Sequence, residues 1–169
     1  MRLFLLATAL LFTASVADAQ IAQDVIQVGG TGNLSIEPEF AFGLAPVVGY
    51  FVTDNIEVGG NPRLSTDFSD FFNATISAFG NYYPTGGTDT DTYPFIGANF
   101  GVAVGDGGGG ILIGGQAGIQ RFISDSAALT LAVRASSDDS FDAVTLLAEA
   151  GFSIFINRGT AENVIDTID

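Results

Sequence analysis

Side chains that could do acid–base or nucleophilic chemistry are few in this 169-residue chain. It contains no histidine and no cysteine, so Ser-His and Cys-His nucleophile systems are not available to it. Carboxylate pairs remain possible, with Glu39 and Glu57 as the candidates, and we favour salt bridges in the protein interior as their role over catalysis. The sequence therefore predicts a protein that is not an enzyme.

Two further stretches look like ligand-binding loops without completing one. Asp106–Gly110 is rich in glycine, but the Lys-Ser/Thr pair of a phosphate loop does not follow it. Asp89-Thr90-Asp91 lacks the later glutamate of a calcium loop. We expect no catalytic residue, no metal site and no cofactor.

The charge balance limits the possible partners. The chain has 19 acidic and 5 basic residues, for a net charge of −14, which argues against binding nucleic acid. Yet 47% of its residues are hydrophobic. A chain that is both this apolar and this acidic must segregate its charges into loops.

The first residues have the features of an export signal. Met1–Arg2 is a short basic start, Leu3–Phe12 is a mostly apolar run, and Ala17-Asp18-Ala19 offers small residues at the cleavage positions. We predict a signal peptide over residues 1–19, cleaved before Gln20. The apolar run is too short for a transmembrane helix, which needs about 20 apolar residues.

Beyond the signal, apolar residues recur at every second position. Leu129, Leu131 and Val133 lie on one side of their stretch, with Thr130 and Arg134 on the other. A period of two indicates a β-strand, because successive side chains point to opposite faces. Strands are predicted at about residues 25–34, 39–52, 56–64, 71–83, 93–104, 111–123, 127–136 and 141–156.

The two faces of these strands differ sharply in charge. The apolar face carries one charged residue, Arg121, which lies two residues from a turn and can extend to lipid headgroups. In an exported chain, this favours an apolar face that meets lipid and a polar face that lines a narrow interior. The sequence therefore predicts an all-β fold: an eight-stranded antiparallel up-and-down transmembrane β-barrel over residues 20–156.

The polar face holds five charged residues that we expect in the lumen as a charge network. Arg63 and Arg134 should be neutralised by carboxylates, because a buried unpaired charge is strongly unfavourable. The candidates are Glu39, Glu57 and Glu149. Without the strand register, the pairs stay open.

Two residue types stand out by position. Pro46 and Pro62 are awkward within a closed sheet, since each removes a ladder donor, and we interpret them as local bulges or rim positions. The tyrosines all fall where strands approach the short connections, and we predict an aromatic girdle at that membrane boundary. The girdle consists of Tyr50, Tyr82, Tyr83 and Tyr93.

Several stretches resemble a known family. Residues 45–59 look like the signature stretch of small bacterial outer-membrane β-barrel proteins, the OmpA/OmpX-like group. Residues 81–84, 93–97 and 118–123 are similar to later stretches of the same group, in the same order. The resemblance spans about residues 24–156. It implies a barrel in the outer membrane of a Gram-negative bacterium, surrounded by lipid, with the short connections on the periplasmic side.

The final strand resembles the pattern that the barrel-assembly machinery of such bacteria reads during biogenesis. Glu149, Gly151, Ile154 and Ile156 supply its polar, glycine and two apolar positions. Members of the group usually end there with a phenylalanine. This chain has Ile156 in that place and continues through residues 157–169, which we predict to be an acidic periplasmic tail.

Two functional classes remain open. The first is a structural or surface-interaction barrel whose lumen is largely plugged by side chains, because eight strands leave an interior just wide enough for them. The alternative is a small passive pore or a carrier of a hydrophobic ligand, which the many lumen glycines would allow. In either case we expect a monomer in the cell outer membrane after signal-peptide cleavage, with lipid and the assembly machinery as partners and no nucleic acid.

Overall fold

The computed structural model describes residues 21–35, 41–66, 72–84, 91–105, 109–138 and 144–157. The predicted signal peptide, Glu39, most of the two candidate ligand loops and residues 158–169 of the predicted tail lie outside the described residues.

Eight strands make up the described part of the chain, and their ends agree with the alternation of the sequence to within three residues. The strands are β1 (Val25–Ser35), β2 (Ala41–Thr53), β3 (Ile56–Thr66), β4 (Phe72–Tyr82), β5 (Thr92–Gly105), β6 (Gly110–Ser124), β7 (Ala127–Asp138) and β8 (Val144–Asn157).

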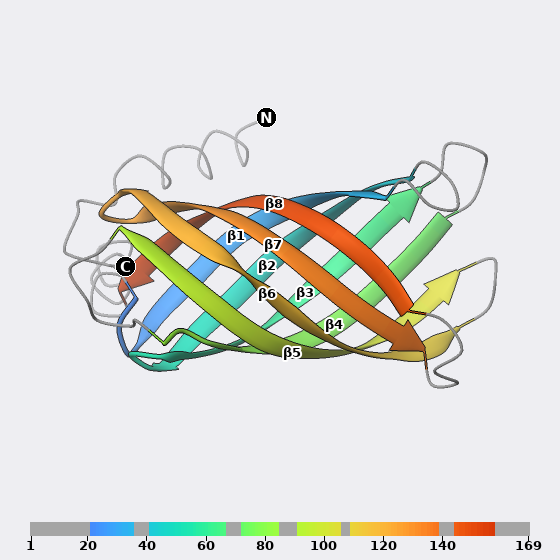
Figure 1. The fold of residues 1–169 in the computed structure, drawn as a ribbon, viewed down its shortest axis with the longest axis horizontal. Helices are drawn as coiled ribbons and strands as arrows, with labels where there is room; N and C mark the ends of the chain where they lie inside the picture. The colour runs from blue at the N-terminus through green and yellow to red at the C-terminus, as the bar shows by residue number, and fades with distance from the viewer. Residues whose placement is uncertain are drawn as a thin grey trace, which may run out of the picture.

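Each strand pairs antiparallel with its neighbours in sequence, and β1 also pairs with β8 to close the sheet. Val28 shows the closure, because it lies opposite Val48 on β2 and opposite Ile154 on β8. Figure 1 shows the resulting cylinder, with the β2–β3 and β6–β7 turns at the end where β1 begins and β8 ends. The predicted closed eight-stranded antiparallel barrel is confirmed. Within the described ranges, no helix has the length and apolar character to cross a membrane.

The register of the wall sets its width. Successive cross-strand partners lead from Leu146 on β8 once around the barrel to Ile156 on the same strand, so one circuit shifts the register by ten residues, from position 146 to position 156. With eight strands, this shift corresponds to a strand tilt of roughly 40° and a backbone radius of ~8 Å. A cylinder of this size has room for side chains inside and little else.

The barrel carries its apolar face outward. Ile76 and Leu146 are 73% and 68% exposed, while the charged side chains of Glu57, Arg134 and Glu149 are buried inside. All the exposed large apolar side chains of the described residues belong to the face that the sequence assigns to the outside, and Arg121 is exposed there too. The arrangement is the reverse of a soluble β-barrel.

One seam of the wall is interrupted in mid-strand. β2 and β3 pair at Leu44 and Leu64 and again at Val48 and Gly60, but the three positions between these pairs on each strand are unpaired. In the described strands, the other seven seams run without such a gap.

The register places Pro46 opposite Pro62 within this gap. The carbonyl of Val48 faces β3. Backbone N–H and C=O groups of residues two apart point to the same neighbouring strand, so the nitrogen of Pro46 faces β3 as well. The carbonyl of Glu57 faces β4, so the nitrogen of Pro62, an odd number of residues away, faces β2. One ladder pair therefore lacks both N–H donors. The interpretation of these prolines as bulges or rim positions is wrong, because both lie within paired strands.

Pro94 on β5 offers a useful contrast. The carbonyl of Gly97 faces β6, so the nitrogen of Pro94 faces β4. The β4–β5 ladder ends at Tyr82 and Ile96, two residues before Pro94 would need a partner. This proline therefore removes no donor from the wall.

Replacing both seam prolines by valine, Pro46→Val with Pro62→Val, restores the two donors. We expect amide exchange at Val48 and Gly60 to slow by about fivefold for each hydrogen bond restored, because one net hydrogen bond is worth roughly 1 kcal/mol. Hydrogen–deuterium exchange followed by NMR in lipid nanodiscs measures these rates, with Pro94→Val as the control that should leave them unchanged. Equal rates in the double variant and the unmodified protein would contradict the seam assignment.

Candidate functional site

Aromatic side chains fill the barrel interior at the short-turn end. Their ring centroids are 4.8–6.1 Å apart, in tilted and edge-to-face contacts that aromatic pairs favour. We call this cluster the aromatic plug. Its members are Phe51, Tyr83, Tyr93, Phe95, Phe122 and Phe155.

The plug corrects the predicted girdle. Tyr83 and Tyr93 are each 1% exposed and lie inside the barrel, so their assignment to a membrane boundary is wrong. The reason is parity: Tyr82 points outward and is half-exposed, so Tyr83, next along the chain, must point inward. Tyr50 lies at the rim, where its hydroxyl donates to Asp24 Oδ1. A boundary role for Tyr50 and Tyr82 stays a prediction.

The segment before β1 covers the aromatic plug at the short-turn end of the barrel. Ile21 is 2% exposed and packs in the same cluster. The backbone N–H of Asp24 donates to the Phe51 carbonyl at 2.9 Å, and that of Gln23 donates to Asp54 Oδ1 at 2.8 Å. Asp24 adopts a positive φ of 66° to make this turn. Sequence reasoning missed this cap, since an Ile and an Asp before a strand carry no signal of it.

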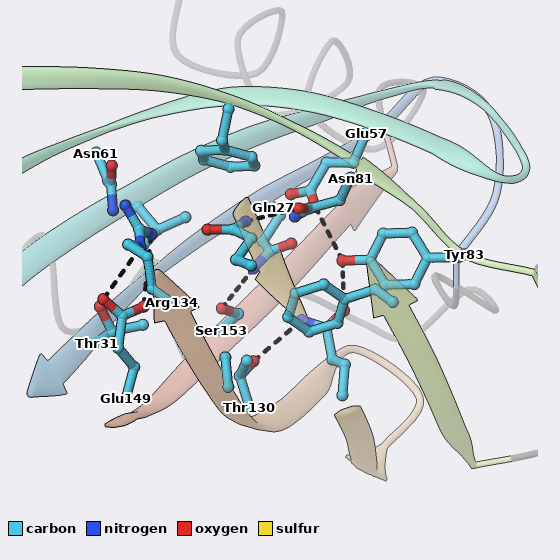
Figure 2. Close-up of a pocket in the computed structure, with 16 residues that line it drawn as sticks. Gln27, Thr31, Glu57, Asn61, Asn81, Tyr83, Thr130, Arg134, Glu149 and Ser153 are labelled. Atoms are coloured by element: carbon cyan, nitrogen blue, oxygen red, sulfur yellow. Dashed lines mark hydrogen bonds and ion pairs between the residues drawn. The ribbon is translucent and has the colours of Figure 1, made fainter. Parts of the chain in front are cut away.

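A polar layer follows the plug, centred on Glu57 (Figure 2). Its Oε2 atom accepts hydrogen bonds from Asn81 Nδ2 and the Tyr83 hydroxyl, both at 2.9 Å. Gln116 Nε2 donates to Asn81 Oδ1 at 2.6 Å. Glu57 is 1% exposed, its Oε1 has no hydrogen-bond partner, and it forms no ion pair within the described part of the chain.

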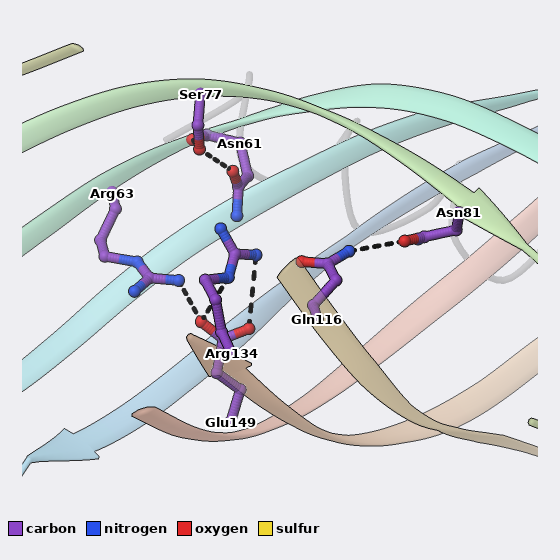
Figure 3. Close-up of polar contacts among 7 residues, drawn as sticks. All are labelled: Asn61, Arg63, Ser77, Asn81, Gln116, Arg134 and Glu149. Carbon is purple, nitrogen blue, oxygen red and sulfur yellow. Dashed lines mark hydrogen bonds and ion pairs between the residues drawn. The ribbon is translucent and has the colours of Figure 1, made fainter. Parts of the chain in front are cut away.

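An ionic cluster lies deeper in the lumen and joins opposite walls (Figure 3). Arg63 on β3 reaches across to Glu149 Oε1 on β8. Arg134 on β7 approaches the same carboxylate, with its Nε 3.3 Å from Oε1 and its Nη2 3.5 Å from Oε2. Two guanidinium groups thus share one carboxylate, which leaves one formal positive charge in excess.

The structure therefore brings together three of the five predicted lumen charges, Arg63, Arg134 and Glu149. Glu57 lies apart from them in the polar layer, and Glu39 lies outside the described residues. A cavity of about 40 Å³ separates the two groups and is lined by Glu57, Arg134 and Glu149 among others. A cavity of this volume has room for only a few water molecules.

Glycines make room for these polar side chains. A Cβ atom at Gly49 would collide with the carboxylate of Glu57, and one at Gly43 would collide with the amide of Asn33. In both cases the polar residue sits on the neighbouring strand. At these places a long polar side chain on one strand occupies the space that a side chain at the glycine of the next strand would need.

The four residues of the predicted assembly signal lie on β8, between β1 and β7. Glu149 points into the lumen, where Gly151 packs against Thr31. Ile154 and Ile156 lie on the other face of the strand and are partly buried. Reading of this pattern by the assembly machinery stays a prediction.

The interior offers hydrogen bonds and ion pairs more than reactive groups. The hydroxyls of Ser77 and Ser153 bond to the amides of Asn61 and Gln27, which are not general bases. In the described part of the chain, no three Asp, Glu, His or Cys side chains gather in a group that could hold a metal ion.

Comparison with known proteins supports the fold at low sequence identity. No family model and no curated protein matches the chain. The N-terminal β-barrel domain of Pseudomonas aeruginosa OprF is similar with a TM-score of 0.65 and 13% identity, over 79% of this chain and 98% of that one. Neisserial surface protein A is similar with a TM-score of 0.59 and 16% identity, over 77% of this chain and 95% of that one. The outer membrane protein OprG from Pseudomonas aeruginosa is similar with a TM-score of 0.57 and 13% identity, over 84% of this chain and 100% of that one. At these identities the likeness shows a shared eight-stranded barrel fold.

The two buried carboxylates should respond differently to neutralisation. Glu149→Gln leaves two buried guanidinium groups without a counter-charge, and we expect it to lower the free energy of unfolding by about 3–5 kcal/mol. Glu57→Gln keeps an oxygen that can accept from Asn81 and Tyr83 and removes a charge that has no ion-pair partner in the described structure, so we expect little loss. Urea unfolding in lipid vesicles compares them. A larger loss for Glu57→Gln would reverse this assignment.

Proposed function

We propose that this protein is a small outer-membrane β-barrel of a Gram-negative bacterium, of the OmpA/OmpX-like kind, with a structural or surface-interaction role and no enzymatic activity. The observation that carries the proposal is the inverted distribution of side chains. Large apolar residues cover the outer wall while the described lumen charges are buried within it. Continuous apolar surface of this extent is unfavourable in water and favourable in lipid.

The lumen supports a barrel that does not conduct. The aromatic plug and the cap at Ile21 fill the short-turn end, and the ionic cluster of Arg63 and Glu149 spans the middle. A continuous aqueous path along the axis would have to displace both. These contacts favour the plugged barrel over the passive pore.

Three further proposals concern biogenesis and assembly. Residues 1–19 are removed on export, β8 is read by the barrel-assembly machinery, and residues 158–169, which follow β8, remain as a periplasmic tail. The mature barrel is a monomer in the lipid of the outer membrane and has no nucleic-acid partner. The alternation of the eight strands and the acidic composition support these statements.

The test is expression of the whole chain in a Gram-negative host, followed by purification in detergent. We expect membrane fractions that release the protein only with detergent, and faster gel migration before heating than after it. In planar bilayers the purified protein should give no stable conductance steps. Recovery as a soluble periplasmic monomer would contradict the membrane proposal, and steady channel steps would contradict the plugged lumen.

Charge substitutions on the two faces give an independent check. Leu131 is 58% exposed on the outer wall, so Leu131→Arg places a charge in lipid and should cost about 2–4 kcal/mol at the bilayer midplane. Arg134→Leu leaves Arg63 and Glu149 as a balanced pair and should fold nearly as well as the unmodified chain. Refolding yields in vesicles measure both. Similar yields for the two variants would mean that the faces are assigned the wrong way round.

A further inference from the structure

We propose that the gap between β2 and β3 is a lateral portal, through which a single-chain amphiphile with an anionic head group passes between the lumen and the surrounding lipid. The proposal rests on the membrane location proposed above. Four observations lead to it, and they come from the wall, the lumen behind it, its charge and its closed end.

The wall is weakest at this seam. With Pro46 opposite Pro62, two carbonyl groups face each other across the seam without a donor from either strand. Lipid supplies no water to satisfy them, so the closed state gains less here than at any continuous seam. Separating the strands over these three positions breaks no ladder hydrogen bond.

The lumen behind the seam is the cavity described above. Val47 on β2 and Asn61 on β3 flank the gap from inside, and both line the cavity. Arg63 lies at the far edge of the unpaired stretch of β3. Separation of the strands would therefore connect the cavity and the Arg63 guanidinium directly with the lipid.

The charge at this place selects an anion. Within the ionic cluster, Arg63 and Arg134 share the one carboxylate of Glu149, which leaves one positive charge in excess there. Glu57 also lines the cavity but forms no ion pair with either arginine in the described structure. Arg134 is 7% exposed, and its Nε lies 3.3 Å from Glu149 Oε1 as an ion pair without forming a hydrogen bond in the described structure. Guanidinium groups bind carboxylate and phosphate groups through charge-assisted hydrogen bonds, so an anionic head group is the ligand that suits this place.

The closed end of the barrel selects an alkyl chain. The aromatic plug blocks axial passage at the short-turn end, and the gap beside Arg63 offers a molecule bound there a direct route sideways into lipid. The outer surface at the seam is apolar, with Leu44 and Leu64 both exposed. The gap of three residues is about 10 Å long, enough for one alkyl chain.

Arginine resonances test the site directly. The full mature chain is placed in nanodiscs of zwitterionic lipid, and sodium dodecanoate is added at submillimolar concentration. We expect the Nε–H signals of Arg63 and Arg134 to shift and that of Arg121, on the outer wall, to stay unchanged. Acetate supplies the head without the chain and dodecan-1-ol the chain without the head, and neither should reproduce the shift. An absent shift, an equal shift with acetate, or an equal shift at Arg121 would overturn the site.

A disulfide lock tests the portal separately. The chain has no cysteine, so Val47→Cys with Asn61→Cys introduces a single cross-link across the gap itself, where the register places the two residues opposite each other. Oxidation should slow dodecanoate binding at least tenfold, and reduction should restore it. The control is Ala98→Cys with Gly115→Cys, a paired position on the continuous β5–β6 seam, whose oxidation should change nothing. Equal binding rates with and without the lock would overturn the portal.

The same samples distinguish the two proposals. Gel migration before and after heating reports the folded membrane barrel without reference to any ligand. If this shift is lost, the proposed membrane barrel fails. If it is kept while the Arg63 and Arg134 signals do not respond to dodecanoate, the barrel stands and the portal fails.

Discussion

In the membrane location proposed above, lipid surrounds the wall and supplies no water to its backbone, so each N–H and C=O must find its partner inside the sheet. This constraint accounts for the closure of β1 on β8, since an open edge would leave a row of unpaired groups. It also gives Pro46 and Pro62 their meaning. In a soluble sheet, water could serve the carbonyls that face them, whereas here the chain tolerates the incomplete seam between two long, otherwise paired strands.

Closure at this register then fixes what the interior must contain. A cylinder of ~8 Å backbone radius is too narrow for bulk water and too wide to stay empty, so inward side chains must satisfy one another. Aromatic rings do this at one end through packing. Farther along, hydrogen bonds around Glu57 and the shared carboxylate of Glu149 replace packing, and Arg63 ties β3 to β8 across the lumen. The inside is thus graded from apolar to charged along the axis.

The alternation of the sequence predicted the strands and their faces, because side-chain direction depends on local geometry alone. The same alternation predicts that Tyr83 points inward, because it follows the outward-pointing Tyr82. The grouping of the tyrosines at one end of the strands favoured a girdle instead. Register is different, since it depends on every turn and closure at once. Without it, neither the choice of Glu149 over Glu57 as arginine partner nor the meeting of Pro46 with Pro62 could be predicted.

The glycines that face polar side chains have an evolutionary consequence. Asn33 fills the volume that Gly43 leaves free, and Glu57 does the same over Gly49. The two side chains of each pair must fit one fixed volume inside the barrel. A larger residue at one position is therefore acceptable only with a smaller one at the other. Lineages of this barrel should therefore drift by linked exchanges, in which bulk moves from strand to strand. Such covarying positions would carry the register in an alignment, where one sequence does not.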